Sequence, residues 1–167
     1  MARLISKAGG PVDYLRIVKL IYLADRESVA KRGIPIVGGR YYSMYRGPVI
    51  SEVMDFVGKR NAPGWKGVIS IRCGNDICLE AAPQFDALSE SELEILDRTV
   101  EAHASRTTDE LVEWCHEHCE EYEQVAAGKR KAIEVEAMLR ALRKPSRAIR
   151  AIIEETKARM ELDQLLA

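Results

Sequence analysis

The stretch that decides the fold is Tyr14-Leu-Arg-Ile-Val-Lys-Leu-Ile-Tyr-Leu-Ala24, near the start of a chain of 167 residues. Its apolar and aromatic positions cover most of the circumference of a helix, and such a helix is usually buried on every side. Pro11 suits a first helical turn, and Gly33 followed by Pro35 favours an end to the helix. The sequence therefore predicts a helix over residues 11–32 that forms the centre of the core.

Shorter segments of β-forming residues follow this helix. Residues 40–45 include three tyrosines, and residues 68–72 and 77–79 flank a Gly-Asn turn that is typical of a β-hairpin. We expect these three segments to build one small antiparallel sheet. Between them, Gly47-Pro48 predicts a sharp turn that leads into a short helix.

The pattern becomes helical from Pro83 onward. Ser89 and Glu92 form a capping-box pattern, Thr108 can cap the next helix, and residues 132–142 predict another. The fold class is therefore α+β: a mostly helical domain around a buried N-terminal helix, with a small antiparallel β-sheet or hairpin and a helical C-terminal extension. We place the domain at residues 1–127 and the extension at residues 128–167.

Composition narrows the class of protein. Hydrophobic residues make up 47% of the chain, which excludes disorder as a description of the whole. The longest apolar run is the five residues 20–24, far short of the roughly 20 that a membrane span needs. The N-terminus has no apolar region of the kind that secretory signals carry. We expect a soluble, cytoplasmic protein that does not associate with a membrane.

Charge is unevenly distributed along the chain. The formal net charge is −1, yet residues 1–72 carry 13 basic and 5 acidic groups, whereas residues 86–124 carry 2 basic and 13 acidic groups. The acidic block is either a surface for a basic partner or a solvated helix face beside the basic half. The sequence pI of about 6.3 lies well below the roughly 9 that is typical of nucleic-acid-binding domains, so a nucleic-acid partner is not expected.

Four cysteines raise the question of a metal site. Two of them lie at i and i+4 in Cys115-His116-Glu117-His118-Cys119. Thiolates and imidazoles are the preferred ligands of zinc, but the spacing is not that of a repeated zinc knuckle. Buried cysteines also pack as small hydrophobic residues, so we predict thiols without a bound metal and keep a metal site as the alternative. The four are Cys73, Cys78, Cys115 and Cys119.

No pattern of residues indicates catalysis. The glycine pairs lack the lysine and the context of a phosphate-binding loop, and no Gly-x-Ser-x-Gly elbow is present. The expectation is a protein that is not an enzyme, with no catalytic residue and no cofactor. The alternative is a metal-dependent enzyme built on Cys115, His116, His118 and Cys119.

The order of motifs between residues 19 and 53 resembles the Panacea domain of SocA-like antitoxins and their phage-associated relatives. The resemblance rests on a Lys-Leu-x-Tyr helix, a glycine that ends it, and a Gly-Pro-Val segment followed by Glu-Val. Residues 88–93 and 111–116 resemble the later helices, with Cys115 where the family usually has threonine before His116. The matching residues are Lys19, Leu20, Tyr22, Gly33, Gly47, Pro48, Val49, Glu52 and Val53.

This resemblance implies an antitoxin-like module of a type II toxin–antitoxin system that neutralises a cognate toxin by direct contact. The alternative is a phage-associated adaptor or regulator that contacts host proteins or DNA. Further possible partners are a host protease and a second copy of the chain, bound through the C-terminal helix.

The Gly47-Pro48 segment has two interpretations. In the first, its only role is to give the backbone the geometry of a strand-to-helix corner. In the second, it also presents Tyr45 and Arg46 to a partner, since tyrosine and arginine dominate interface hot spots. The candidate partner-binding residues are Tyr22, Asp25, Tyr42, Tyr45, Arg46, Gly47, Pro48 and Glu52.

The last segment of the chain predicts an amphipathic helix that starts at Pro145 or Ser146. Its apolar stripe must be buried against the domain itself, a second copy or the partner, because an isolated helix of this length is marginal in water. The stripe consists of Ile149, Ile152, Ile153, Met160 and Leu165.

Overall fold

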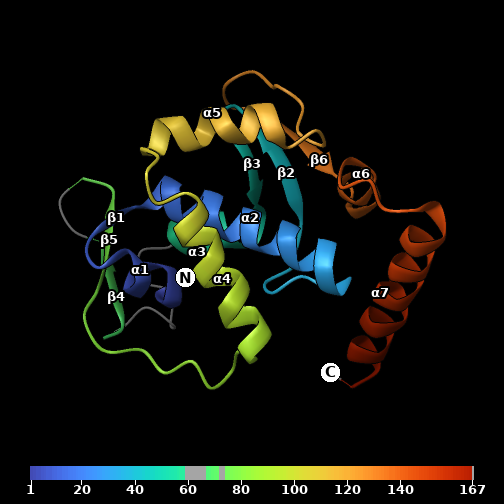
Figure 1. Ribbon diagram of the computed structural model, residues 1–167, viewed down its shortest axis with the longest axis horizontal. Coiled ribbons are helices and arrows are strands. Elements are labelled where there is room, and N and C mark those ends of the chain that lie inside the picture. The colour runs from blue at the N-terminus through green and yellow to red at the C-terminus, as the bar shows by residue number, and fades with distance from the viewer. Residues whose placement is uncertain (59–66, 72–73, 167) are drawn as a thin grey trace.

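The computed structural model describes residues 1–58, 67–71 and 74–166 and is a mostly helical α+β fold, as the sequence predicts (Figure 1). Cys73 and the side chains of Met160 and Leu165 lie outside the described residues. The described helices are α1 (Ala2–Ala8), α2 (Tyr14–Arg32), α3 (Ser51–Gly58), α4 (Glu90–Ala102), α5 (Thr108–His118), α6 (Val135–Ala141) and α7 (Ser146–Leu166). The described strands are β1 (Val12–Asp13), β2 (Tyr41–Met44), β3 (Gly47–Ile50), β4 (Ile69–Ile71), β5 (Asp76–Leu79) and β6 (Arg130–Ile133).

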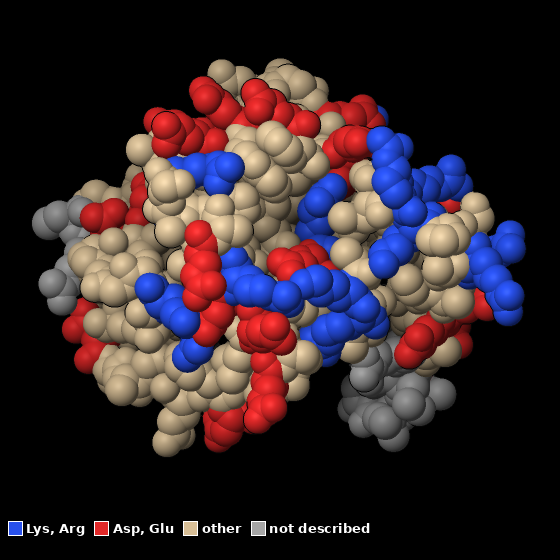
Figure 2. All heavy atoms as spheres, viewed as in Figure 1, with Lys and Arg blue, Asp and Glu red and all other residues tan. Residues whose placement is uncertain are grey.

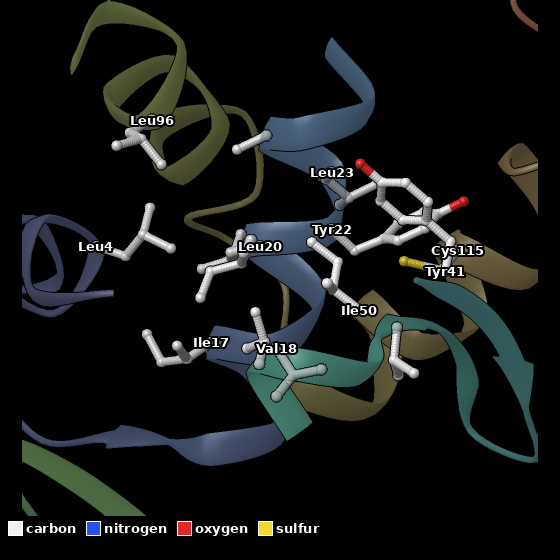
Figure 3. Packing of buried hydrophobic residues seen from close by; sticks show 14 of the residues in the cluster. Leu4, Ile17, Val18, Leu20, Tyr22, Leu23, Tyr41, Ile50, Leu96 and Cys115 are labelled. Carbon is white, nitrogen blue, oxygen red and sulfur yellow. The ribbon is translucent and has the colours of Figure 1, made fainter. Parts of the chain in front are cut away.

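Helix α2 is the centre of the core, and twelve of its nineteen residues are buried. One side of it packs towards Leu4 of α1 and Leu96 of α4, while the other faces Ile50 and Cys115 (Figure 3). The helix begins three residues later than expected, because the Asp13 side chain accepts hydrogen bonds from the first turn and caps it. The residue after α2, Gly33, adopts φ 77°, so the predicted end is confirmed.

The strands form two sheets instead of the single sheet that the sequence predicted. One sheet has the order β1-β5-β4, and the other has the order β3-β2-β6; all pairs are antiparallel. The β4–β5 hairpin is confirmed, but its partner is β1, while β2 pairs with β3 and β6. Figure 1 places the two sheets towards opposite ends of α2, which separates them.

The Gly47-Pro48 segment is the start of strand β3, so the predicted sharp turn at this position is wrong. The turn lies at Tyr45 and Arg46, and it makes β2 and β3 a hairpin that feeds directly into α3. An edge strand tolerates proline because one row of its backbone groups has no strand partner, and β3 is the edge of its sheet.

The helix predicted for residues 132–142 begins only at Val135, because Ala132 and Ile133 belong to strand β6. This strand pairs with the side of β2 that β3 leaves free, with Tyr41 opposite Ile133, and so satisfies backbone groups that would otherwise lack partners. β6 therefore lies beyond residue 127 in the chain and yet completes a sheet of the preceding residues.

The later helices follow their capping signals closely. Ser89 and Glu92 form the predicted capping box of α4, and Thr107 with Glu110 forms another for α5, one residue before the expected cap. In α7, Ile149 is buried, and Ile152 lies against Gly33 at the end of α2. The first half of the last helix therefore packs on its own domain. Within the described residues, none of the helices combines the length and the apolar character that crossing a membrane requires.

Candidate protein-binding surface

The tip of the β2–β3 hairpin is the most exposed apolar point of this sheet. Tyr45 is 55% exposed, and among the described residues only it and Val37 are large hydrophobic side chains classed as exposed. The neighbouring Arg46 is also exposed and pairs with Asp109 in the first turn of α5. The hairpin tip, which we define as Tyr45 and Arg46, therefore lies beside α5.

Helix α5 carries a row of exposed carboxylates next to this tip. In Figure 2 acidic atoms cover the upper rim of the molecule, where α5 lies in Figure 1. Part of the acidic block of the sequence thus forms a real surface, which we call the acidic face. It consists of Asp109, Glu110, Glu113 and Glu117.

A buried lysine holds the β2–β3 hairpin from the side of the core. Lys19 on α2 is fully buried, and its Nζ donates a hydrogen bond of 2.8 Å to the carbonyl oxygen of Pro48. Gly47 has φ 92°, and a Cβ at this position would lie 3.0 Å from Lys19 Nζ and 3.3 Å from the ring of His116. The Gly-Pro segment is therefore pressed against α2 and α5, where only glycine fits without displacing a neighbour.

His116 and Tyr122 support the same hairpin from the side of α5. Their rings stack with centroids 4.6 Å apart, and the Tyr122 hydroxyl donates to the carbonyl oxygen of Met44. Burial lowers the pKa of His116 below its usual value. Its Nε2 is buried and has no hydrogen-bond partner among the described residues.

A second set of buried polar groups surrounds Glu121. Its carboxylate accepts a hydrogen bond of 2.7 Å from the Tyr22 hydroxyl and another of 2.7 Å from Arg26 Nε. Nearby, the side chains of Cys115 and Cys119 interact, and this interaction lowers the pKa of Cys115 and raises that of Cys119. These contacts tie α2 to the end of α5.

Asp25 organises the loop between α2 and β2. Its two oxygens accept hydrogen bonds of 2.8–2.9 Å from the backbone N–H groups of residues 36, 37 and 38, and one of 3.1 Å from the Tyr41 hydroxyl. Burial raises the pKa of this carboxyl group, and the four donors act in the opposite direction. Asp25 therefore supplies the acceptors for backbone N–H groups of this loop, which a neighbouring strand or helix would otherwise have to supply.

One protein-family model covers the part of the chain in which most of these contacts lie. The family model described as "Antitoxin SocA-like, Panacea domain" matches residues 17–121, which is more than half of the chain. The chain belongs to this family. Neither the curated proteins nor the solved structures yielded a significant match.

The matched part of the Panacea domain contains all eight candidate partner-binding residues, which the structure distributes over surface and interior. Tyr45, Arg46 and Glu52 are exposed, and Tyr42 is half-buried with the guanidinium of Arg130 4.7 Å from its ring centroid. Glu52 accepts hydrogen bonds from the backbone and side chain of Arg40. The structure buries the other four, which are Tyr22, Asp25, Gly47 and Pro48.

Sequence reasoning missed the polar residues beneath the surface of this Panacea domain. A lysine within an otherwise apolar helical stretch was the available signal for Lys19. Glu121 gave none, because Tyr22 and Arg26 lie about a hundred residues away in the chain. The sequence indicated His116 only through the family resemblance and as a metal-ligand alternative, and its contact with Gly47 was not predicted. The sequence showed the acidic residues only as a block of charge and did not indicate which of them share one surface.

The cysteines of the Panacea domain are spread between two regions. Cys115 and Cys119 lie in the contacts between α2 and α5, and Cys78 is buried on β5. All three have free thiols. Over the described residues, no group of three or more histidine, cysteine and acidic side chains is arranged to hold a metal ion.

Lys19 gives the Panacea domain a testable dependence of stability on pH. Burial lowers the pKa of Lys19 to about 8, whereas an unfolded lysine titrates near 10.5. Between these values the unfolded chain binds more protons, so the free energy of unfolding rises with pH. We expect wild type to gain about 1–2 kcal/mol more than Lys19→Met between about pH 8 and 10 in urea titrations.

The titration stops at about pH 10 because tyrosine hydroxyls in the unfolded chain begin to ionise above this pH. The pKa values of Tyr22 and Tyr41 are raised above their usual value, so these hydroxyls contribute stability that is lost as pH rises further. Lys31→Met, at an exposed position of the same helix, is the control and should follow the wild-type curve. Parallel curves for wild type and Lys19→Met would contradict a depressed lysine pKa.

Proposed function

We propose that this chain is the antitoxin of a type II toxin–antitoxin system and that it neutralises its toxin by direct contact. Membership of the SocA-like antitoxin family supports an antitoxin role in general. The observation that carries the finer proposal is the exposed Tyr45 and Arg46 pair beside the acidic face. Tyrosine and arginine contribute large contact areas with few rotatable bonds, so they are frequent interface anchors.

The support beneath the tip favours this surface over other exposed residues. Lys19 holds β3 through the carbonyl oxygen of Pro48, and Tyr122 holds β2 through that of Met44. Both strands of the hairpin are thus anchored within a few residues of the tip. An anchor that is ordered before binding loses less conformational entropy on association, which favours affinity.

The acidic face adds a requirement on the toxin. A basic patch on the toxin, next to its pocket for Tyr45, would match the carboxylates of α5. Such complementarity accelerates association more than it strengthens the final complex. We therefore propose that the antitoxin acts by covering a basic functional surface of the toxin, without catalysis and without a cofactor.

The experiment combines the purified chain with the product of the reading frame next to its gene. We expect the double variant Tyr45→Ala/Arg46→Ala to weaken binding by about 10- to 100-fold in a calorimetric or surface-binding measurement, because hot-spot truncations cost about 1–3 kcal/mol or more. Growth rescue by co-expression should fall in parallel.

Val37→Ala is the matched control, since Val37 is comparably exposed at 51% but lies in the loop before β2, away from the tip. It should bind like wild type. Equal losses in the two variants, or an unchanged affinity of the double variant, would show that the hairpin tip is not the toxin-binding site.

A further inference from the structure

Helices α6 and α7 form a short helix–turn–helix unit. α6 ends at Ala141 and α7 begins at Ser146, so four residues connect them. Figure 1 shows α6 nearly end-on and α7 from the side, so that the two helices run in clearly different directions. A helix pair joined in this way by three or four residues is the arrangement that many DNA-binding proteins use.

The turn between the two helices has a defined geometry. Arg143 adopts φ 58°, its N–H donates to the carbonyl oxygen of Arg140, and the N–H of Lys144 donates to that of Leu139. This pattern is a Schellman motif, which ends a helix at a fixed angle. Leu139 of α6 and Ile149 of α7 are buried, so each helix is also fixed by a side chain in the core. The orientation of α7 relative to α6 is therefore set by the fold.

The central part of the unit, around the turn, is basic. Residues 137–153 contain five basic residues and no acidic residue. In Figure 2 basic atoms gather on the right of the molecule, where Figure 1 places α6 and the start of α7. The five are Arg140, Arg143, Lys144, Arg147 and Arg150.

Several of these cations form no ion pair with the residues that the structure describes. Arg140 pairs with Glu136, and Arg143 pairs with Glu120. Within the described residues, no ion pair involves Lys144, Arg147 or Arg150. The free charges therefore lie in the turn and in the first two turns of α7.

Three of the five basic residues, Arg140, Lys144 and Arg150, line one hollow of about 410 Å³. Its position between the helices brings together cations that are as far apart in the chain as Arg140 and Arg150. One carboxylate, that of Glu136, belongs to the same lining and is already paired. The hollow is lined by Glu136, Arg140, Lys144, Ser146, Ile149 and Arg150.

We propose that the α6–turn–α7 unit binds duplex DNA, with the first two turns of α7 in the major groove and its free cations on the phosphates. The major groove of B-form DNA admits a helix, whereas that of A-form RNA is too deep and narrow. Glu154 and Glu155 begin the next turn of α7, which confines the basic contact to its start. Residues at the start of the second helix are those that reach the groove in such units.

This proposal revises the expectation drawn from the overall pI. The net charge of −1 averages over the whole chain, and it conceals an acidic α5 and basic residues around the α6–α7 turn, which lie on different elements. The DNA-binding surface is therefore separate from the hairpin tip and the acidic face. A toxin on the hairpin tip would leave α7 accessible, so the proposal does not depend on the proposed antitoxin mechanism.

The test measures binding of the full chain to a fluorescent duplex of about 25 base pairs of mixed sequence, long enough for two turns of the helix. We expect affinity to fall steeply between about 50 and 200 mM salt, as counterions are released from the phosphates. Arg147→Gln/Arg150→Gln should weaken binding at least about tenfold and reduce the salt slope by about 2, because two phosphate contacts are lost.

Lys31→Gln/Arg98→Gln is the matched control, since it removes two cations from the α2–α4 side of the molecule that both pair with Glu27. It should retain wild-type affinity, and all variants should retain the wild-type circular dichroism spectrum. Equal weakening by the control would overturn the assignment to α7. The proposal is equally overturned by absence of duplex binding, or by tighter binding of single-stranded DNA, duplex RNA or an acidic polypeptide.

Discussion

Asp25→Ala is expected to lower the free energy of unfolding by roughly 3–4 kcal/mol, because it removes the acceptor of four hydrogen bonds at once. Three backbone N–H groups of the loop after α2 and the buried hydroxyl of Tyr41 would lose their partner. Leaving a buried donor unsatisfied costs about 1–3 kcal/mol, and water can reach part of this loop, which limits the total. Urea denaturation followed by circular dichroism measures the change.

Asp25→Asn tests whether hydrogen bonding is the cause. The amide keeps one acceptor oxygen and presents an NH₂ group to the remaining donors, so we expect about half of the loss seen for alanine. Glu94→Ala, which removes an exposed carboxylate from α4, should change stability by no more than about 0.5 kcal/mol. If Asp25→Asn were as stable as wild type, charge and acceptor number would both be unimportant here.

This result would also bear on the candidate partner-binding residues. Tyr22 belongs to the motif that resembles the Panacea family and Asp25 follows it three residues later, and both are fully buried. Both side chains make internal hydrogen bonds, Tyr22 with Glu121 and Asp25 with the loop after α2. Tyr45 and Arg46 are instead exposed, and the internal contact of Arg46 is a surface ion pair with Asp109, so the proposed contact surface rests on these two residues.

The sequence predicted features that depend on neighbours in the chain. The periodicity of residues 14–24 identified the buried helix, and the capping box at Ser89 located the start of α4. The turn signal at Gly74 and Asn75 identified the β4–β5 hairpin. In each case the interaction that stabilises the element acts within a few residues.

Features that depend on distant partners were not predictable in this way. Strand β6 exists because β2 has a free edge, and nothing in Arg130–Ile133 itself indicates that edge. The same holds for β1, which pairs with β5 more than sixty residues later. Lys19 is buried because Pro48 supplies a carbonyl acceptor, and that contact follows only from the arrangement of the hairpin against α2.

The Gly47→Ala variant is expected to lower the free energy of unfolding by about 2–4 kcal/mol, from two separate causes. A positive φ costs a residue with a Cβ about 1–2 kcal/mol, and here φ is 92°. In addition, the new methyl group would press on Lys19 Nζ and on the ring of His116.

Gly128→Ala separates the two causes, because Gly128 has φ 78° and nothing lies within 4 Å of an added Cβ. It should lose only the backbone contribution, about 1–2 kcal/mol, in the same thermal and urea measurements. Equal losses in both variants would mean that packing against Lys19 adds nothing. A larger loss for Gly47→Ala is the expected result, and it would show that the close packing of Gly47 against Lys19 and His116 adds to the backbone contribution.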